Sequence, residues 1–166
     1  MERVMIIGCG GAGKSTLARA LGEKNGLPVV HLDQIWWAPG NWEHLSREEF
    51  DVRLAAEMEK DRWIMDGNFN RTLDVRLERA DTVIYLDFPR WLCLRGWIGR
   101  VIKNWGCARE DMAPGCNERF DPEMARWIWN FNKQNRQRYL EKLMDWNGEV
   151  HILHNHREVK HFLSQM

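Results

Sequence analysis

The chain has 166 residues, with 24 Lys and Arg against 24 Asp and Glu. This length suits one domain with its own core, and the balanced charge gives no general attraction for nucleic acid or a membrane surface. No apolar run is long enough to cross a bilayer, and the apolar start at residues 4–7 is too short for an export signal. The four cysteines form no Cys-x-x-Cys pair, so we expect free thiols. Taken together, these features lead us to expect a cytoplasmic protein without a membrane partner, and a nucleic-acid partner is not favoured.

The first predicted elements are a buried strand over residues 3–7, a glycine-rich turn, and a helix over residues 14–24. The turn, Gly8-Cys-Gly-Gly-Ala-Gly13-Lys14-Ser15, matches the phosphate-binding pattern Gly-x-x-x-x-Gly-Lys-Ser/Thr (Walker A) in full. Glycines let backbone N–H groups approach a phosphate closely, and the following helix N-terminus adds a partial positive charge. The expected nucleoside triphosphate site consists of Gly8, Gly10, Gly11, Ala12, Gly13, Lys14, Ser15 and Thr16. In it, Lys14 reaches the β- and γ-phosphates and the Ser15 hydroxyl binds Mg²⁺.

Strand and helix signals then alternate along the rest of the chain. Further strands are expected at residues 27–32, 62–65, 82–86 and 150–153, with helices at residues 47–60, 72–80, 90–103, 122–146 and 157–163. Ser46 with Glu49 forms a capping box, and Asp121 followed by Pro122 marks a helix start. This alternation predicts a parallel sheet covered by helices on both faces, in one domain spanning residues 1–166.

Two segments interrupt the alternation. Residues 34–41 contain Pro39-Gly40 and are predicted to form a loop. Residues 104–120 contain glycine and proline without a periodic pattern. A loop this long inside a compact domain usually has a function, and we expect a mobile lid.

The whole chain resembles the adenylate-kinase-like family of P-loop kinases, through its first-strand phosphate loop, five strands and Arg-flanked lid. Several stretches also resemble the bacterial DNA topology modulation proteins, whose name describes a cellular phenotype. These stretches are H-L-D at 31–33, W-W-A-P-G-N-W at 36–42, D-G-N-F at 66–69, A-D-T-V-I-Y-L-D-F-P-R at 80–90 and W-I-W-N-F at 127–131. The resemblance implies a three-layer P-loop NTPase fold with a five-stranded parallel sheet. It also implies ATP and Mg²⁺ as cofactors, and an acceptor-binding region at residues 34–60.

Two aspartates follow predicted strands. In the adenylate-kinase-like fold the third strand lies beside the first, which implies that Asp66 faces Mg²⁺ together with Ser15. A carboxylate that only caps the turn is the alternative. Asp33 ends the second strand at the sheet edge where ligands bind, and there it would orient a hydroxyl acceptor and take its proton. A plain turn carboxylate is an equal alternative for Asp33, and a monophosphate acceptor would need no base.

Tryptophan is unusually frequent, with ten in the chain, and Trp36, Trp37 and Trp42 fall within seven positions. The family resemblance places the phosphoryl acceptor in this segment. Trp36 and Trp37 are therefore candidates for stacking on a ring of the acceptor, and packing of a small subdomain is the equal alternative.

Several arginines follow the places where phosphates would lie. Arg71 lies five residues beyond Asp66, near the acceptor-phosphate arginine of adenylate kinases, and Asn68 and Arg76 are further substrate-binding candidates. Guanidinium groups that converge on the moving charge are what phosphoryl transfer needs. For this role we select Arg100, on the helix that leads into the lid, and Arg136 or Arg138, on the helix after it.

The loop after the final strand is expected to cover the donor base through Asn155 and Arg157. Together these patterns predict an ATP-dependent phosphotransferase that transfers the γ-phosphate of Mg-ATP to a nucleotide, a nucleoside or a hydroxylated small molecule. Its predicted catalytic residues are Lys14, Asp33, Asp66, Arg100 and Arg136. A regulatory ATPase or a nucleic-acid-associated protein is the alternative, the latter through a basic patch on the 126–138 helix. The sequence leaves a monomer and a homodimer equally open.

Overall fold

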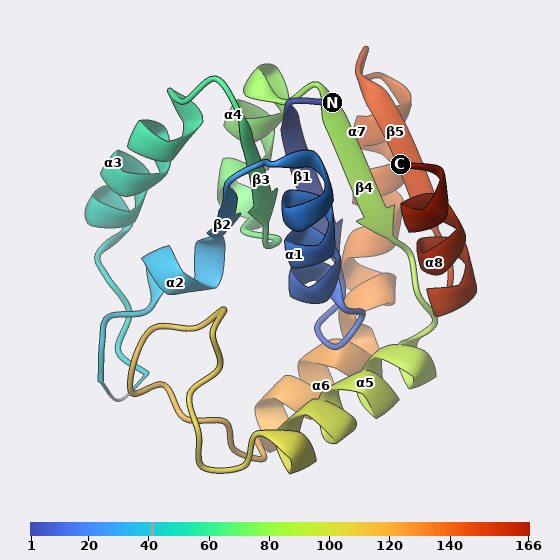
Figure 1. The fold of residues 1–166 in the computed structure, drawn as a ribbon. Helices are drawn as coiled ribbons and strands as arrows, with labels where there is room; N and C mark the ends of the chain where they lie inside the picture. Colours follow the sequence, from blue (N-terminus) through green and yellow to red (C-terminus); the bar gives the residue numbers. More distant parts are fainter. Residues whose placement is uncertain (41) are drawn as a thin grey trace.

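The structure is a computed structural model that describes residues 1–40 and 42–166. Within these residues the chain forms a five-stranded sheet in the order β2-β3-β1-β4-β5 (Figure 1). The strands are β1 (Arg3–Gly8), β2 (Val29–His31), β3 (Trp63–Asp66), β4 (Thr82–Leu86) and β5 (Glu149–Leu153). The helices are α1 (Lys14–Asn25), α2 (Leu32–Trp36), α3 (Arg47–Met58), α4 (Leu73–Arg79), α5 (Arg90–Lys103), α6 (Pro122–Phe131), α7 (Gln137–Met144) and α8 (His156–Gln165).

All four strand pairs are parallel, and helices cover the sheet on both faces. In Figure 1, α1 and α8 lie in front of the sheet, and α4 and α7 lie behind it. The central strands β1, β3 and β4 are buried almost completely, as expected for a parallel sheet between two helical layers. The predicted three-layer α/β fold is confirmed.

The register of the sheet sets the position of the phosphate loop. β1 lies between β3 and β4, and Ile6 is the register partner of Asp66. The carboxyl ends of β1 and β3 therefore meet at one edge, where the glycine-rich turn begins. This is the strand neighbourhood that the resemblance to adenylate-kinase-like proteins implies.

The second strand ends earlier than predicted. β2 stops at His31, and residues that were expected to form a strand end and a loop form the short helix α2. Leu32 turns into the core with none of its surface exposed, and the backbone N–H of Trp37 donates to the Asp33 carbonyl at 3.1 Å. Asp33 therefore lies in the first turn of a helix. Asn41, which closes the predicted loop, lies outside the described residues.

The helix predicted over residues 122–146 is present with a change of pitch in its middle. α6 continues into a π-helical segment, Asn132–Arg136, and then into α7. The Asp121 side chain accepts hydrogen bonds from the backbone N–H groups of Glu123 and Met124, as the capping pattern predicts. At the start of this segment the Asn132 amide donates to the carbonyl of Phe88, just after β4, at 2.9 Å.

Residues 104–120 are irregular, as predicted, and contain only isolated bridges such as Trp105 with Glu118. In Figure 1 this segment passes below α2 and the carboxyl end of the sheet. No helix among the described residues combines the length and the apolar character needed to cross a membrane.

Candidate functional site

The glycine-rich turn has the backbone shape that its sequence predicts. Gly11 and Gly13 have φ angles of +80° and +94°, in the region that side chains disfavour. A Cβ on Gly11 would lie 2.1 Å from the Cys93 carbonyl oxygen, so this glycine also lets the turn pack against α5. No side chain caps the first turn of α1. The turn therefore presents free backbone N–H groups and a helix N-terminus to the solvent, which is the arrangement that binds phosphate.

Lys14 and Ser15 follow directly from this turn. The Lys14 ammonium donates to the carbonyl oxygens of Gly8 and Cys9, at 3.0 and 3.1 Å, and so lies across the turn. The Ser15 hydroxyl donates to Asp66 Oδ2 at 2.6 Å. The structure therefore brings Ser15 and Asp66 together, as predicted, in a pair of oxygen ligands that suits Mg²⁺.

Sequence reasoning missed the partner on the other side of Asp66. His31 Nδ1 lies 2.5 Å from Asp66 Oδ1, and both side chains are buried. A chain of contacts thus joins α1, β3 and β2 through Ser15, Asp66 and His31. The signal that would have revealed His31 is the register of the sheet, in which His31 is the partner of Asp66.

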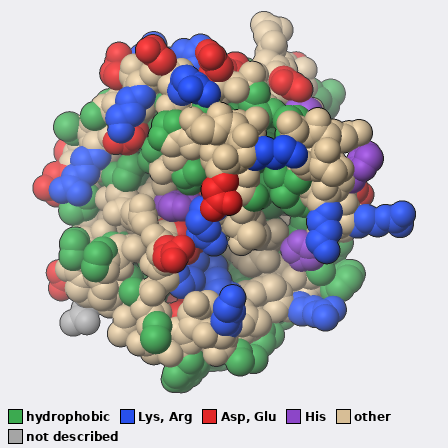
Figure 2. Space-filling view, in the orientation of Figure 1, with side chains coloured by type: hydrophobic (Ala, Val, Ile, Leu, Met, Phe, Trp, Pro, Cys, Tyr) green, Lys and Arg blue, Asp and Glu red, His purple; other side chains and the backbone are tan. Residues whose placement is uncertain are grey.

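A cavity of about 640 Å³ opens above the turn, between α1, α5 and residues 108–111. Its cationic lining residues are Lys14, Arg19, Arg100, Lys103 and Arg109. In Figure 2, basic and acidic side chains gather around the hollow near the middle of this face. Arg100 lies where the sequence predicts it, facing the phosphate-binding turn.

Two lid carboxylates, which sequence reasoning also missed, hold the arginines of this cavity. Arg109 lies 2.6 Å from Asp111 and 2.7 Å from Glu118, and Arg100 lies 3.4 Å from Glu118. Burial raises the pKa of Asp111, but Arg109 and the Ser15 hydroxyl outweigh it and leave the pKa below its usual value. Burial lowers the pKa of Arg100, and the neighbouring Arg109 adds to this effect. Two of these ion pairs lie within the lid, and the pair of Arg100 with Glu118 joins the lid to α5.

Asp33 belongs to the same electrostatic centre. Burial raises the pKa of Asp33 above its usual value, and the nearby Asp66 carboxylate raises it further. Lys14 and Arg109 act in the opposite direction. Although Asp33 lies on α2 and not at a strand end, the fold brings it to the edge of the sheet predicted for it.

The three clustered tryptophans divide between two environments. Trp36 stacks on His44, with ring centroids 4.8 Å apart, and lines a second cavity of about 250 Å³. The other residues of that lining are Arg47, Phe50, Phe69, Asn70, Arg71 and Thr72. Trp37 packs edge-on against Trp42 and joins a small apolar cluster with the lid. Trp36 therefore lines a cavity with one face covered by His44, and Trp37 shows the packing alternative.

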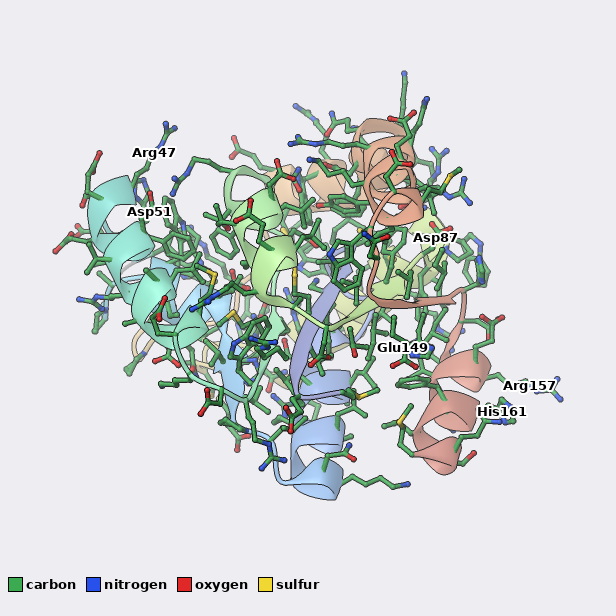
Figure 3. The ribbon with its side chains drawn as sticks, turned by 90° about the horizontal axis from the view of Figure 1, so that it is seen from above. Arg47, Asp51, Asp87, Glu149, Arg157 and His161 are labelled. Carbon is green, nitrogen blue, oxygen red and sulfur yellow. The ribbon has the colours of Figure 1, made fainter. Side chains whose placement is uncertain are left out.

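Arg71 lines the second cavity but is already paired. Its guanidinium donates two hydrogen bonds to the Asp51 carboxylate on α3, at 2.8 and 2.6 Å. These bonds to Arg71 lower the pKa of Asp51. Figure 3 shows Asp51 and Arg47 on α3, at one side of the molecule.

The side chains of Arg76 and Asn68, predicted to bind the acceptor, form hydrogen bonds to backbone atoms. Arg76 has no exposed surface, and its guanidinium donates to the carbonyls of Gly67, Asn68, Phe69 and Thr72. Burial lowers the pKa of Arg76 to about 10. Asn68 uses its side-chain amide on the backbone of Gly8, accepting from its N–H at 3.0 Å and donating to its carbonyl at 2.9 Å. Both side chains shape the loop after β3, because their polar atoms are bound to backbone.

The remaining candidates lie away from the first cavity. Arg136 Nε lies 2.9 Å from both carboxylate oxygens of Asp87, just after β4, so the fold does not bring it to Arg100. Asn155 caps α8 by accepting hydrogen bonds from the backbone N–H groups of Arg157 and Glu158. Arg157 extends from α8 into solvent, as Figure 3 shows. The predicted contacts of Asn155 and Arg157 with a donor base stay predictions.

The fold and the phosphate-binding turn place the chain among proteins with the adenylate-kinase-like P-loop kinase fold. No family model matches the chain. An adenylate kinase from Clavibacter michiganensis is 28% identical over 109 residues, which cover 64% of this chain and 52% of that protein. The match thus spans about half the length of that relative.

Solved structures with this fold cover nearly the whole chain. A shikimate kinase from Bacteroides thetaiotaomicron has a TM-score of 0.58 at 15% identity and covers 99% of this chain and 95% of its own. A shikimate kinase from Acinetobacter baumannii in complex with shikimate has a TM-score of 0.57 at 16% identity, over 99% and 90% of the two chains. A putative kinase from Chloroflexus aurantiacus has a TM-score of 0.56 at 17% identity, over 99% and 97%. The predicted kinase-like fold is confirmed, and the resemblance to DNA topology modulation proteins stays a prediction.

Proposed function

We propose that this protein is an ATP-dependent kinase that transfers the γ-phosphate of Mg-ATP to a small-molecule acceptor. The observation that carries the proposal is the first cavity, in which an uncapped helix N-terminus faces five cationic side chains. Such a cavity suits a polyanion of the size of a triphosphate. The likeness to adenylate and shikimate kinases supports phosphoryl transfer as the reaction.

In this proposal the chain's own residues position and neutralise the phosphates. The backbone N–H groups of Gly11 and Gly13 and the ammonium of Lys14 bind the donor, while Ser15 and Asp66 hold Mg²⁺ directly or through water. Mg²⁺ supplies a charge that neutralises the oxygens of the phosphates when it is bound. Arg100 and Arg109, the latter from the lid, neutralise the charge that moves with the phosphoryl group.

The lid would exclude water from the transferred group. Its segment from Ala108 to Asp111 forms one wall of the first cavity. Exclusion of water suppresses hydrolysis of the triphosphate and strengthens each electrostatic contact inside the cavity.

Replacement of Lys14 by alanine tests the proposal. We expect phosphoryl transfer to fall about 100-fold or more, on the scale seen when a charge-stabilising donor is removed. Lys160→Ala, an exposed lysine on α8, is the matched control and should keep the parent rate. ADP release and calorimetry with Mg-ATP give the two readouts, and an unchanged rate in Lys14→Ala would contradict the assignment.

The alternatives make different predictions in the same assays. A regulatory ATPase would release ADP at one rate whatever acceptor is added. A nucleic-acid protein would shift DNA in a salt-dependent way, through the basic residues of the 126–138 helix. Within that group Arg136 is already paired with Asp87, which weakens the patch.

A further inference from the structure

The second cavity has an aromatic wall. Trp36, Phe50 and Phe69 contribute it, and the rings contact one another: Phe50 stacks on Phe69 with centroids 4.9 Å apart. Trp36 meets both of them edge-on, at 5.4 and 5.9 Å. Its volume of about 250 Å³ lies just under the range of roughly 300 to 1,000 Å³ that drug-sized ligands occupy. A wall of this kind suits one small flat ring, which gains by stacking on an indole or phenyl face.

The same cavity has little free positive charge. Arg71 is neutralised by its two hydrogen bonds to Asp51, and Arg76, behind the loop, is bound to backbone carbonyls. Among the described residues of the lining, Arg47 at the exposed start of α3 is the arginine without a carboxylate partner. A phosphate monoester carries close to two negative charges, and proteins usually bind it with several guanidinium groups or N–H groups together. In the first cavity Arg100 and Arg109 are also paired with lid carboxylates, but Lys14, Arg19 and Lys103 line it as well, beside the backbone N–H groups of the turn. The first cavity therefore offers a larger set of donors for a phosphate than the second.

A carboxylate lies on the helix between the two cavities. Asp33 and Trp36 are three positions apart on α2, so they share one side of this short helix. Asp33 is under the electrostatic influence of Asp66 and of Lys14, which lines the first cavity, whereas Trp36 lines the second. A carboxylate at this position repels an incoming phosphate but accepts a hydrogen bond from a hydroxyl group.

From these three observations we infer that the acceptor is an uncharged hydroxyl compound with a flat aromatic ring, of the nucleoside class, and not a nucleoside monophosphate. This inference rests on the proposed kinase function. The ring stacks against Trp36, and the hydroxyl group points past Asp33 toward the phosphate-binding turn. Its oxygen forms a bond to the γ-phosphorus while the bond from that phosphorus to the bridging oxygen breaks. ADP leaves with the electron pair, and the hydroxyl proton passes to Asp33.

The decisive experiment compares matched acceptors. ADP release from Mg-ATP is measured with adenosine, guanosine, cytidine and thymidine, each against its own 5′-monophosphate. We expect at least one nucleoside to stimulate ADP release on the order of tenfold or more over its monophosphate, and phosphorus NMR to show a new phosphate monoester. Stimulation by the monophosphates instead would overturn the inference and leave the kinase function intact. Stimulation by neither class, with Mg-ATP binding retained, would also overturn it.

Variants of Trp36 test the stacking contact itself. Trp36→Ala should raise the acceptor KM on the order of tenfold while the KM for ATP stays near that of the parent, because a lost stacking partner affects the acceptor alone. Trp36→Phe keeps a flat face and should recover most of that loss. Trp91→Ala, an exposed tryptophan on α5, is the matched control. An equal acceptor KM in all three variants would contradict the inference, and melting curves exclude unfolding as the cause.

A different set of results would show that the proposed kinase function itself is wrong. If Mg-ATP neither binds nor protects against melting, and Lys14→Ala changes nothing, the kinase proposal and the inference fall together.

Discussion

The two cavities of this protein have linings of different chemistry. The cavity above the phosphate turn has about 640 Å³, a floor of glycine backbone and five cationic side chains. The cavity beside α2 has about 250 Å³, three aromatic side chains and an arginine already paired with a carboxylate. Charge and backbone N–H groups recognise phosphates of any nucleotide, whereas an aromatic wall selects by the shape of a ring. The comparison suggests that donor binding is general and that selectivity resides in the acceptor cavity.

Replacement of Arg76 has the largest expected effect, which is on the free energy of unfolding. Comparison with Arg71 distinguishes an arginine that supports the fold from one that lines a cavity. Arg76→Ala should lower the free energy of unfolding by about 3 kcal/mol or more, since it empties a buried volume and leaves several backbone carbonyls without a donor. Arg71→Ala, on the exposed pair with Asp51, should cost less than about 1 kcal/mol. Urea denaturation of both variants measures the difference. Equal losses would show that Arg76 does not support the loop.

Asp66 tests the donor cavity alone. If Asp66 holds Mg²⁺ as proposed, Asp66→Asn should slow phosphoryl transfer about 100-fold at a fixed Mg²⁺ concentration, because it would remove one charged oxygen ligand beside Ser15. Part of the rate should return as Mg²⁺ is raised, and the acceptor KM should not change. A Mg²⁺ titration of the rate shows this directly. A rate that Mg²⁺ does not rescue would assign Asp66 to the turn and not to the metal.

Asp33 links activity to stability. Burial raises its folded-state pKa, so the ionised carboxylate is less favourable in the folded protein than in the unfolded chain. The parent should therefore lose stability as pH rises from about 4 through the raised pKa. Asp33→Asn removes this loss and should be more stable than the parent at pH 7, while transferring phosphate more slowly. Melting temperatures of both proteins between pH 4 and 8 test it. A parallel pH dependence in the two would refute this account.

Replacement of Asp51 has the smallest expected effect, and it tests most directly how the charge of the second cavity determines which acceptor is used. Asp51→Asn frees the Arg71 guanidinium, so use of a nucleoside monophosphate should rise several-fold while stability changes by less than about 1 kcal/mol. The ratio of kcat/KM for a nucleoside and its monophosphate measures the shift. No change in that ratio would mean that Arg71 does not face the acceptor.

The sequence predicts the donor side well because its signals are local. The turn from Gly8 to Ser15 is a contiguous pattern. The resemblance to adenylate-kinase-like proteins implies that β3 lies beside β1, and this neighbourhood brings Asp66 to Ser15. The start of α2 was predicted less well. Leu32 enters the core and begins a helix, and this depends on tertiary packing that a short apolar run does not reveal.

Side-chain partners far apart in the sequence were not predictable in the same way. Arg71 and Arg76 are the same residue type five positions apart, yet one is exposed and the other fully buried. The spacing of residues does not distinguish them, because burial depends on how the loop after β3 folds back. Glu118 was missed for a related reason: its partners Arg100 and Arg109 meet it only through the folding of the irregular segment 104–120.

The contact between the lid and residues 36–42 has a consequence for the order of events. Met112, Ala113 and Cys116 form an apolar cluster with Trp37 and Trp42, and the Gly40 N–H donates to the Pro114 carbonyl at 2.9 Å. The cluster thus joins the lid, whose residues 108–111 line the first cavity, to the segment after Trp36, which lines the second. A movement of either segment away from its cavity would have to separate the same cluster. We expect a single gating rate, seen as one phase of tryptophan fluorescence in stopped flow, whichever substrate is mixed first.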